Sequence, residues 1–413
     1  MTDLLPVAAP VETAAPVETA APVETAASVE TAAAAGRRRA SFNPLVVADV
    51  RRLTADAIEV TFEVPEDLAA QYDYIPGQYV ALRATIDGQD VRRSYSICAE
   101  PQPGEIRIAI KRDLGGIFST YANESLRRGD VVQVMSPQGA FISRHAMTGL
   151  NHPDELQAEL ARTAATSFVA FAAGSGITPV IAIAKTALAA SPSTRFDLVY
   201  VNKAAMDVMF LEELADLKDR YPARLAVHHV LTREQRISPL MTGRIDAEKL
   251  AAIFSTVLQA DDVDEWFLCG PFELVQLCRD TLTARGVPDD KVRYELFTTG
   301  DPKKPEGNIG RPVLLDESAK SVEITFRLDG RQGTVASPVH AQESILNAAL
   351  RVRPDVPFAC AGGVCGTCRA KLISGTVQMS ENYALEPDEI ARGFVLTCQS
   401  HPTSDTVNVD YDA

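Results

Sequence analysis

The pattern of hydrophobic segments changes near residue 167, and this change limits the possible folds more than any other feature. From residue 167 to about 297, short apolar runs alternate with segments of helical pattern, as in SFVAFAA followed by PVIAIAKTALAA and EWFLCG followed by FELVQLCRDTLTARG. Strands that alternate with helices form a parallel sheet wrapped by helices. We therefore predict an α/β domain in residues 151–300.

The preceding segment, residues 43–150, has strand-like runs and few helical ones. AIEVTFEV, QYVALRATI, EIRIAIKR and DVVQVMS are separated by turn residues such as Asp87-Gly88 and the RRGD of 127–130. Several short strands at this spacing predict an antiparallel β-barrel. A polar, helix-prone stretch at 153–162 is expected to cover the junction with the next domain.

The two ends of the chain differ from these domains. Residues 1–42 contain four copies of a hexapeptide, APVETA or ASVETA, whose period fits neither a helix nor a strand, and we expect a disordered tail. Residues 301–312 are rich in glycine, proline and charge and predict a linker. Residues 313–413 predict a small α+β domain, β-grasp-like, with SVEITFRLDG and QGTVAS as a hairpin and ESILNAALR as a helix.

Composition excludes several classes of protein. The chain of 413 residues has a net charge of −15, which disfavours nucleic acid as a partner. No apolar run reaches the roughly 18 residues that cross a membrane, and no signal peptide is visible. The seven cysteines are odd in number and three of them crowd into one loop, which argues against a disulfide framework. We expect a cytoplasmic protein with reduced thiols.

The cysteine loop near the C-terminus predicts a metal cluster. Cys360, Cys365 and Cys368 have the spacing C-x4-C-x2-C, and Cys398 follows thirty positions later. This is the plant-type spacing for a [2Fe–2S] cluster held by four thiolates. Structural zinc would need a second C-x2-C pair. Three glycines in the loop would permit positive φ and close backbone approach, namely Gly362, Gly363 and Gly366. Cys98 and Cys278 are expected to be small buried hydrophobes.

A second glycine loop lies between a predicted strand and a predicted helix. FVAFAAGSGITPV places Gly174 and Gly176 at this turn, with Thr178 suited to the N-cap and Pro179 to the first helical position. The N–H groups and the dipole at such a helix start attract a pyrophosphate. The βαβ context strengthens the prediction of a nucleotide site.

Residues after the next two strands bear on which nucleotide binds. The second strand ends in Asn202-Lys203, with no acid to hold ribose hydroxyls, and the third ends with Thr232 and Arg233. Two cations and a hydroxyl favour a 2′-phosphate, and hence NADPH. The alternative is that Lys203 and Arg233 are ordinary surface charges.

Four ordered motifs then resemble a known family. RRSYS (92–96), GGIFS (115–119), GSGITP (174–179) and CGP (269–271) look like the ferredoxin–NADP reductase superfamily. The C-terminal cysteine loop makes the chain similar to its oxygenase-reductase branch. The resemblance covers residues 43–413, although 142–166 match weakly and the hexapeptide tail is not a family feature.

The resemblance implies an FAD site in residues 43–150. Arg93 would pair with the pyrophosphate, Tyr95 would pack on the isoalloxazine, and Ser96 would lie near flavin N5. Further positions come from the same motif, from the GGIFS motif and from the residue just before it: Ser94, Gly116, Ser119 and Lys111.

The resemblance also implies a nicotinamide site in residues 151–300. The matching residues are Gly174, Gly176, Thr178, Cys269, Gly270 and Pro271. Cys269 would lie near the nicotinamide, and Glu295 resembles an acid near the flavin. With Ser96 they form the expected catalytic set. The alternatives are that Cys269 is a core cysteine and that Glu295 is an exposed charge.

Together these expectations describe an electron path from NADPH to FAD to [2Fe–2S] and on to an external oxygenase. The last domain, in PFACAGGVCGTCRAK and VDYD, is similar to the reductases of phenylacetyl-CoA epoxidases, which serve a di-iron, multisubunit 1,2-epoxidase. The reductases of Rieske-type ketosteroid hydroxylases share much of this, and a redox-sensing protein without turnover is a further alternative. Four acids are expected to steer a basic partner or to form a solvated face: Glu381, Glu386, Asp388 and Glu389.

Overall fold

The protein is described by a computed structural model that covers residues 42–113, 115–139, 141–145, 166–258, 262–296, 320–353, 356–358, 363, 366–380, 382, 385 and 387–413. The hexapeptide tail, the helix-prone stretch 153–162 and the predicted linker 301–312 lie outside the described residues. The predictions made for them therefore stay predictions.

The first domain is an antiparallel barrel, as predicted. Its strand order is β4-β3-β6-β1-β2-β5, and a bridge between Ile97 and Ile108 joins the end of β4 to β5. Apolar residues of alternating position fill the interior, and Phe118 of helix α1 packs among them. The turn between β3 and β4 is the expected Asp87-Gly88, with φ of 51° and 77°, which suits a two-residue hairpin. The elements are β1 Phe42–Thr54, β2 Ala57–Glu63, β3 Tyr79–Ile86, β4 Gln89–Ser96, β5 Glu105–Lys111, α1 Ile117–Glu124 and β6 Val131–Met135.

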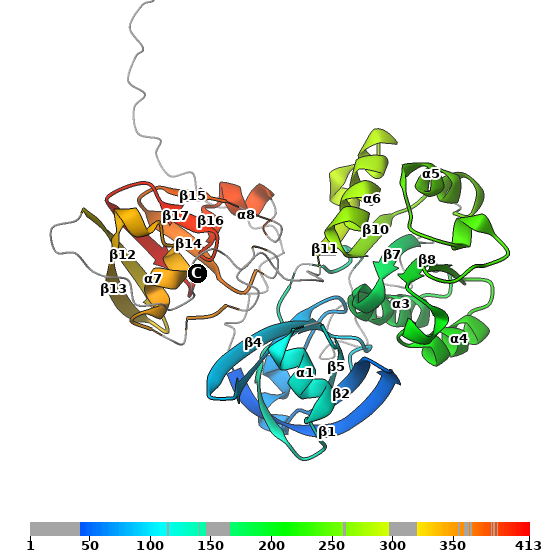
Figure 1. Ribbon diagram of the computed structural model, residues 1–413, viewed down its shortest axis with the longest axis horizontal. Helices are drawn as coiled ribbons and strands as arrows, with labels where there is room; N and C mark the ends of the chain where they lie inside the picture. The colour runs from blue at the N-terminus through cyan, green and yellow to red at the C-terminus, as the bar shows by residue number, and fades with distance from the viewer. Residues whose placement is uncertain are drawn as a thin grey trace, which may run out of the picture. The chain divides into compact units, whose positions relative to one another are not determined.

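The second domain is the predicted parallel sheet between two layers of helices (Figure 1). Its order is β11-β10-β7-β8-β9, with α3 and α4 on one face and α5 and α6 on the other. The chain order reverses between β7 and β10, and ligands of such sheets bind beyond the carboxyl ends of the strands at that point. The elements are β7 Ser167–Ala173, α3 Ile177–Ala190, β8 Arg195–Asn202, α4 Leu211–Arg220, β9 Leu225–Leu231, α5 Ala247–Thr256, β10 Glu265–Gly270, α6 Phe272–Ala284 and β11 Val292–Leu296.

The third domain is α+β, as predicted. The expected hairpin turns at Asp329-Gly330, β18 pairs in parallel with β12, and α7 begins after Ser344, whose hydroxyl accepts a hydrogen bond from the Asn347 N–H. A five-stranded sheet has the order β13-β12-β18-β14-β16, beside a small β15–β17 pair. The elements are β12 Ser321–Leu328, β13 Arg331–Pro338, α7 Ile345–Leu350, β14 Arg369–Ser374, β15 Val377–Met379, α8 Pro387–Ala391, β16 Phe394–Leu396, β17 Ser400–Pro402 and β18 Thr406–Asp410.

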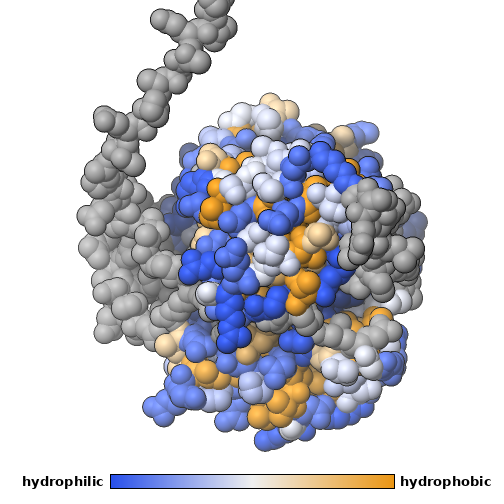
Figure 2. Space-filling model, turned by 90° about the vertical axis from the view of Figure 1, so that its left-hand side faces the viewer, coloured by the Kyte–Doolittle hydropathy of each residue, from blue (hydrophilic) through white to orange (hydrophobic). Residues whose placement is uncertain are grey.

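Within the described part of the chain, no helix is long and apolar enough to cross a bilayer. On the face drawn in Figure 2, hydrophobic residues occur in small groups among hydrophilic ones. This mixture is ordinary for a protein surface in water.

Candidate functional site

The two glycine segments of the parallel sheet pack backbone against backbone. A Cβ at Gly176 would lie 2.2 Å from the Cys269 carbonyl oxygen, so only glycine fits there. Gly174 has a φ of +54°, and its carbonyl accepts a hydrogen bond of 3.0 Å from the Tyr200 hydroxyl. The GSG turn and the CGP segment are therefore in direct backbone contact at the point where the sheet order reverses. Bare backbone at this place fits a pyrophosphate.

The start of α3 differs from the prediction. The helix begins at Ile177 after a 3₁₀ turn, so Thr178 is not the N-cap and Pro179 is not the first helical residue. The Thr178 hydroxyl instead donates a 3.0 Å hydrogen bond to the Ser175 carbonyl inside the first turn. Pro179 costs nothing here, because the first helical N–H groups have no intrahelical acceptor.

Lys203 and Arg233 lie side by side beyond the ends of β8 and β9. The Arg233 N–H donates to the Lys203 carbonyl at 2.8 Å, and the Thr232 N–H donates to the Asn202 carbonyl at 2.8 Å. Both cationic side chains are exposed. The fold thus brings together the charges that the sequence assigned to a 2′-phosphate, at the edge of the sheet that carries the glycine turn.

The three expected catalytic residues come together where the barrel meets the parallel sheet. Ser96, 3% exposed at the end of β4, donates a 3.2 Å hydrogen bond to Oε2 of Glu295 on β11. Cys269 on β10 is the direct strand partner of Glu295. Because Glu295 is half-buried and receives this bond, the alternative of an exposed charge is wrong. No sequence pattern had predicted β11 itself, although VRYEL has enough β-favouring residues to suggest it.

Burial raises the pKa of two ionisable groups near this junction, Cys269 and Tyr95. Cys269 is fully buried, and burial, with a smaller effect of Glu295, raises the pKa of its thiol well above the usual value. Burial also raises the pKa of Tyr95. Both groups are therefore neutral at physiological pH, and neither acts as an anion. This arrangement supplies shape and hydrogen bonds rather than a nucleophile.

The strand that precedes Ser96 carries the flavin motif. Arg93 is exposed and donates a 2.7 Å hydrogen bond to the Arg92 carbonyl. Tyr95 is half-buried, with its ring 5.8 Å from that of Phe118. The Ser94 Oγ is buried without a hydrogen-bond partner in the described structure. A buried hydroxyl with no partner fits a group supplied by a ligand.

The turn before α1 is built around Ser119. Its hydroxyl accepts a hydrogen bond from the Asp113 N–H at 3.1 Å and donates one to the Gly116 carbonyl at 3.3 Å. A Cβ at Gly116 would lie 2.5 Å from that hydroxyl. The turn therefore keeps bare backbone at the start of a helix, as a phosphate site requires. Lys111, which was also assigned to the flavin, forms an ion pair with Asp56 at 3.2 Å.

The cysteine loop is described in part. Cys368 and Cys398 are buried, 3% and 7% exposed, whereas Cys360 and Cys365 lie outside the described residues. The Cys368 carbonyl accepts hydrogen bonds from Thr397 N–H and Oγ1, at 3.1 and 2.9 Å, which holds the segments of both thiols together. Gly363 and Gly366 have φ of 77° and 67°, which confirms the positive φ predicted for them. Two buried thiols held this way fit a cluster site.

One of the four acids predicted to steer a partner or to be solvated does neither. Glu389 is 4% exposed and pairs with the Arg369 guanidinium at 3.0 Å. That arginine follows Cys368 directly, so the pair stabilises the base of the cluster loop. The other three acids are not described at the side-chain level.

Comparisons with known proteins agree with this order of sites. Three family models match in succession: an oxidoreductase FAD-binding domain at residues 44–142, an oxidoreductase NAD-binding domain at 171–280, and a 2Fe-2S iron-sulfur cluster binding domain at 326–403. The predictions of an FAD domain, a nicotinamide-nucleotide domain and a [2Fe–2S] domain are thereby confirmed.

Relatives match over almost the whole chain. One subunit of the 1,2-phenylacetyl-CoA epoxidase of Escherichia coli (strain K12) is 42% identical over 373 residues, which is 90% of this chain and 98% of that protein. The ferredoxin reductase component of 3-ketosteroid-9-alpha-monooxygenase from Rhodococcus rhodochrous is 30% identical, over 89% and 96% of the two chains. The solved structure of phthalate dioxygenase reductase has a similar fold, with a TM-score of 0.52 at 22% identity over 89% and 98%.

Proposed function

The chain belongs to the family of oxygenase reductases that combine an FAD-binding, an NAD-binding and a [2Fe–2S]-binding domain, and from this premise we propose that it is the NADPH-dependent reductase of a phenylacetyl-CoA 1,2-epoxidase. The similarity to the epoxidase protein, at 42% identity, supports this choice of partner over the ketosteroid system, at 30%.

The structural observation that supports hydride transfer at this junction is the hydrogen bond between Ser96 and Glu295. It joins the last residue of the flavin motif to the strand beside Cys269. Hydride transfer depends on the orientation of two stacked rings more than on acid–base groups. Ser96 and the buried, neutral Cys269 would lie on either side of the stacked flavin and nicotinamide rings and would fix the positions of those rings. Neither side chain would react with the hydride.

The remaining site residues have binding roles in this proposal. Arg93 and the turn at Gly116 would hold the flavin pyrophosphate, Ser94 would donate to the flavin, and Tyr95 would pack on its ring. The GSG turn would hold the nicotinamide nucleotide. Bound FAD and the [2Fe–2S] cluster supply the electron chemistry, with two electrons taken from the nicotinamide and passed on one at a time. The cluster would be held by Cys360, Cys365, Cys368 and Cys398.

The preference for NADPH depends on Lys203 and Arg233. Their backbones are hydrogen-bonded to each other, both side chains are exposed, and the residues that end β8, Asn202 and Lys203, include no acid to hold free ribose hydroxyls. A charge-assisted contact to a phosphate contributes about 1.5–3 kcal/mol, so loss of both contacts should reduce discrimination by more than about tenfold.

The test is the ratio of kcat/KM for NADPH to that for NADH. The double variant K203A/R233A should lower this ratio by more than about tenfold, mainly through the KM for NADPH. The matched control is R220A, which removes an exposed arginine at the end of α4. If the wild type prefers NADH, or if the double variant keeps the wild-type ratio, the assignment of NADPH is wrong.

The oxygenase partner is tested by reconstitution. The tagged protein should co-purify with oxygenase subunits, and the mixture should epoxidise phenylacetyl-CoA when NADPH is added. If the co-purified subunits oxidise a steroid and not phenylacetyl-CoA, the partner is the Rieske-type alternative. The reductase assignment would survive that result.

Turnover itself separates a reductase from a redox sensor. Anaerobic addition of NADPH should rapidly bleach the flavin and cluster absorbance, and an added electron acceptor should restore it repeatedly. A protein that is reduced once and does not turn over would be a sensor. The proposal places the protein in the cytoplasm, where thiols such as the buried Cys98 and Cys278 stay reduced.

A further inference from the structure

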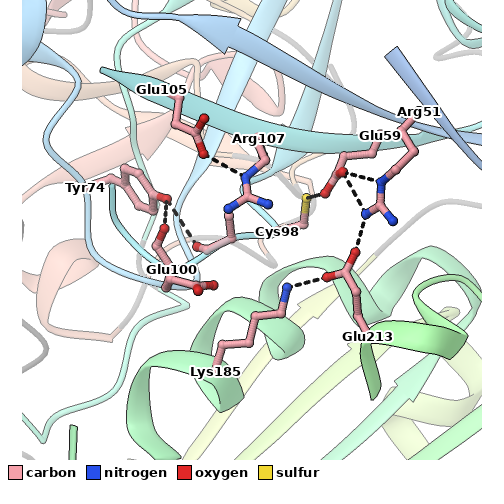
Figure 3. Close-up of polar contacts among 10 residues, drawn as sticks. Arg51, Glu59, Tyr74, Cys98, Glu100, Glu105, Arg107, Lys185 and Glu213 are labelled. Atoms are coloured by element: carbon pink, nitrogen blue, oxygen red, sulfur yellow. Dashed lines mark hydrogen bonds and ion pairs between the residues drawn. The ribbon is translucent and has the colours of Figure 1, made fainter. Parts of the chain in front are cut away.

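A chain of charged contacts crosses from the barrel to the parallel-sheet domain. In Figure 3, the side chains of Arg51 on β1, Lys185 on α3 and Glu213 on α4 point toward one another. The Glu213 carboxylate forms ion pairs with both Arg51 and Lys185. Arg51 also pairs with Glu59 on β2, with an Nη2–Oε2 distance of 2.8 Å. Each acid thus lies against a cation, and Glu213 bridges the two domains.

The burial of these groups makes the bridge more than a surface ion pair. The side chain of Glu59 is 6% exposed, that of Lys185 14% and that of Glu213 21%, whereas Arg51 is 43% exposed. Burial alone would raise the pKa of Glu213, but Lys185 and Arg51 outweigh it and hold that pKa below its usual value. The Glu213 carboxylate is therefore charged at neutral pH, and salt screens its ion pairs less than exposed ones.

The two ends of the bridge attach to the two cofactor-binding segments. On the barrel side, Glu59 Oε1 accepts a 3.7 Å hydrogen bond from the Sγ of Cys98, which lies two residues after Ser96. On the other side, Lys185 belongs to α3, the helix that starts at the GSG turn. The contacts therefore link the segment that ends the flavin motif to the helix that carries the nucleotide turn.

Hydrophobic packing also joins the two domains at this junction. One cluster of buried residues includes members of both domains, such as Ala57, Cys98 and Ala109 of the barrel and Ile181, Ala184 and Leu188 of α3. Such packing is not directional, because it depends on buried area. The ion pairs of the bridge join particular atoms of the two domains, so they depend on direction as well as on area.

We propose that Arg51, Glu213 and Lys185 are positioning residues for hydride transfer, because their bridge sets the orientation of the nucleotide domain on the flavin barrel. This inference rests on the proposed function. None of the three residues belongs to a predicted cofactor-binding motif. Their role is to hold the end of β4, with Ser96, against the parallel sheet, with Cys269, while the nucleotide binds and dissociates.

The first test uses E213Q, which removes the bridging charge and keeps the side-chain volume. At saturating NADPH, the anaerobic stopped-flow rate of flavin reduction should fall by about tenfold or more, since a small misplacement of reacting groups has effects of that size. The dissociation constant for NADPH and the FAD content should change less than about twofold, because both binding segments are intact. E213D should recover part of the rate. The control E212Q changes the exposed neighbour on α4 and should behave as wild type.

The second test acts from the other side of the bridge and has a readout that needs no turnover. K185M should slow flavin reduction to the same extent, and the double variant E213Q/K185M should be no slower than either single variant. Hydrogen–deuterium exchange of the resting protein, without NADPH, should rise in peptides of β1 and of α4 for both variants and not for E212Q.

The results of these tests decide whether the bridge positions the two domains for hydride transfer or only stabilises the fold. If E213Q lowers the melting temperature but leaves the rate of flavin reduction unchanged, the bridge is only structural and the inference is wrong. The same conclusion follows if the effects of E213Q and K185M on the rate multiply. If the wild-type flavin is not reduced by NADPH at all, the proposed function fails, whereas the exchange result still reports on the bridge.

Discussion

The turn before α1 and the turn before α3 share a layout. Each begins with a glycine of positive φ, Gly115 at +77° and Gly174 at +54°. Each then has a second glycine without such a φ, and a hydroxyl residue in the first helical turn that donates to a carbonyl three residues back, as Ser119 and Thr178 do. Both would hold a pyrophosphate in the proposed function.

The second glycines differ in what surrounds them. A Cβ at Gly116 would meet the Ser119 hydroxyl at 2.5 Å, which is a side-chain atom of the same turn. A Cβ at Gly176 would meet the Cys269 carbonyl oxygen at 2.2 Å, which is the backbone of a central strand. A hydroxyl can rotate away, but a strand paired on both sides cannot. The flavin turn is thus self-contained, whereas the nucleotide turn depends on its neighbour in the sheet.

The variant G176A should have the largest effect. The added methyl must push the turn and the Cys269–Gly270 backbone of β10 apart, and overpacking of this kind costs about 1–3 kcal/mol or more of unfolding free energy. The same shift should raise the dissociation constant of the nicotinamide nucleotide by at least about tenfold. Urea unfolding and a binding titration measure the two effects.

Gly174 supplies the contrast for that experiment. It has positive φ, but a Cβ added there would meet nothing within 4 Å, so G174N should lose far less unfolding free energy than G176A, because asparagine tolerates this φ. Equal losses in the two variants would show that conformation, and not contact with Cys269, determines the need for glycine.

The variant G116A should have a smaller effect that a second change relieves. The methyl displaces the Ser119 hydroxyl and should lower the FAD content of the purified protein. In G116A/S119A the displaced atom is absent, so the double variant should be more stable than the sum of the single losses predicts, by about 0.5–1 kcal/mol or more. Strict additivity of the unfolding free energies would mean that the two positions do not compete for space.

Sequence reasoning predicted the glycines of both turns but not the atoms that make them necessary. The motifs GSGITP and GGIFS are local, and so is the hydrophobic periodicity that predicted the barrel, the parallel sheet and the α+β domain. The partner of Gly176 is Cys269, which is distant along the chain and adjacent only because β7 and β10 pair. Contacts between distant segments depend on the folded arrangement, which local patterns do not contain.

The errors that concern β11 and Glu389 have the same cause. The strand β11 is short and carries two charged residues, Arg293 and Glu295, so its pattern is weak, yet it places Glu295 against Ser96. Glu389 is buried because Arg369 pairs with it across the fold. The N-cap expected at Thr178 failed because the 3₁₀ turn starts the helix earlier. The bridging role of Glu213 had no signal in the sequence at all.

Removal of the Ser119 hydroxyl tests how far the flavin turn holds itself together. S119A loses the bonds to the Asp113 N–H and to the Gly116 carbonyl, and each net hydrogen bond contributes about 0.5–1.5 kcal/mol. We expect FAD to dissociate more easily and the unfolding free energy to fall by about 1–2 kcal/mol. The control S125A removes an exposed hydroxyl at the other end of α1 and should retain FAD normally. Full FAD retention in S119A would contradict a self-contained turn.

The corresponding change in the nucleotide turn, T178V, should have the smallest effect. Valine keeps the shape of the buried side chain and loses one hydrogen bond, to the Ser175 carbonyl, while Gly176 still locks the turn against β10. The unfolding free energy should fall by about 0.5–1 kcal/mol. The control T186V loses an equivalent bond to the Ala182 carbonyl further along α3 and should have a similar cost. Because the sheet positions the turn, neither variant should change nucleotide affinity more than about twofold. A larger loss of affinity in T178V alone would show that the hydroxyl itself contacts the nucleotide, and the two turns would then be more alike than their glycine contacts indicate.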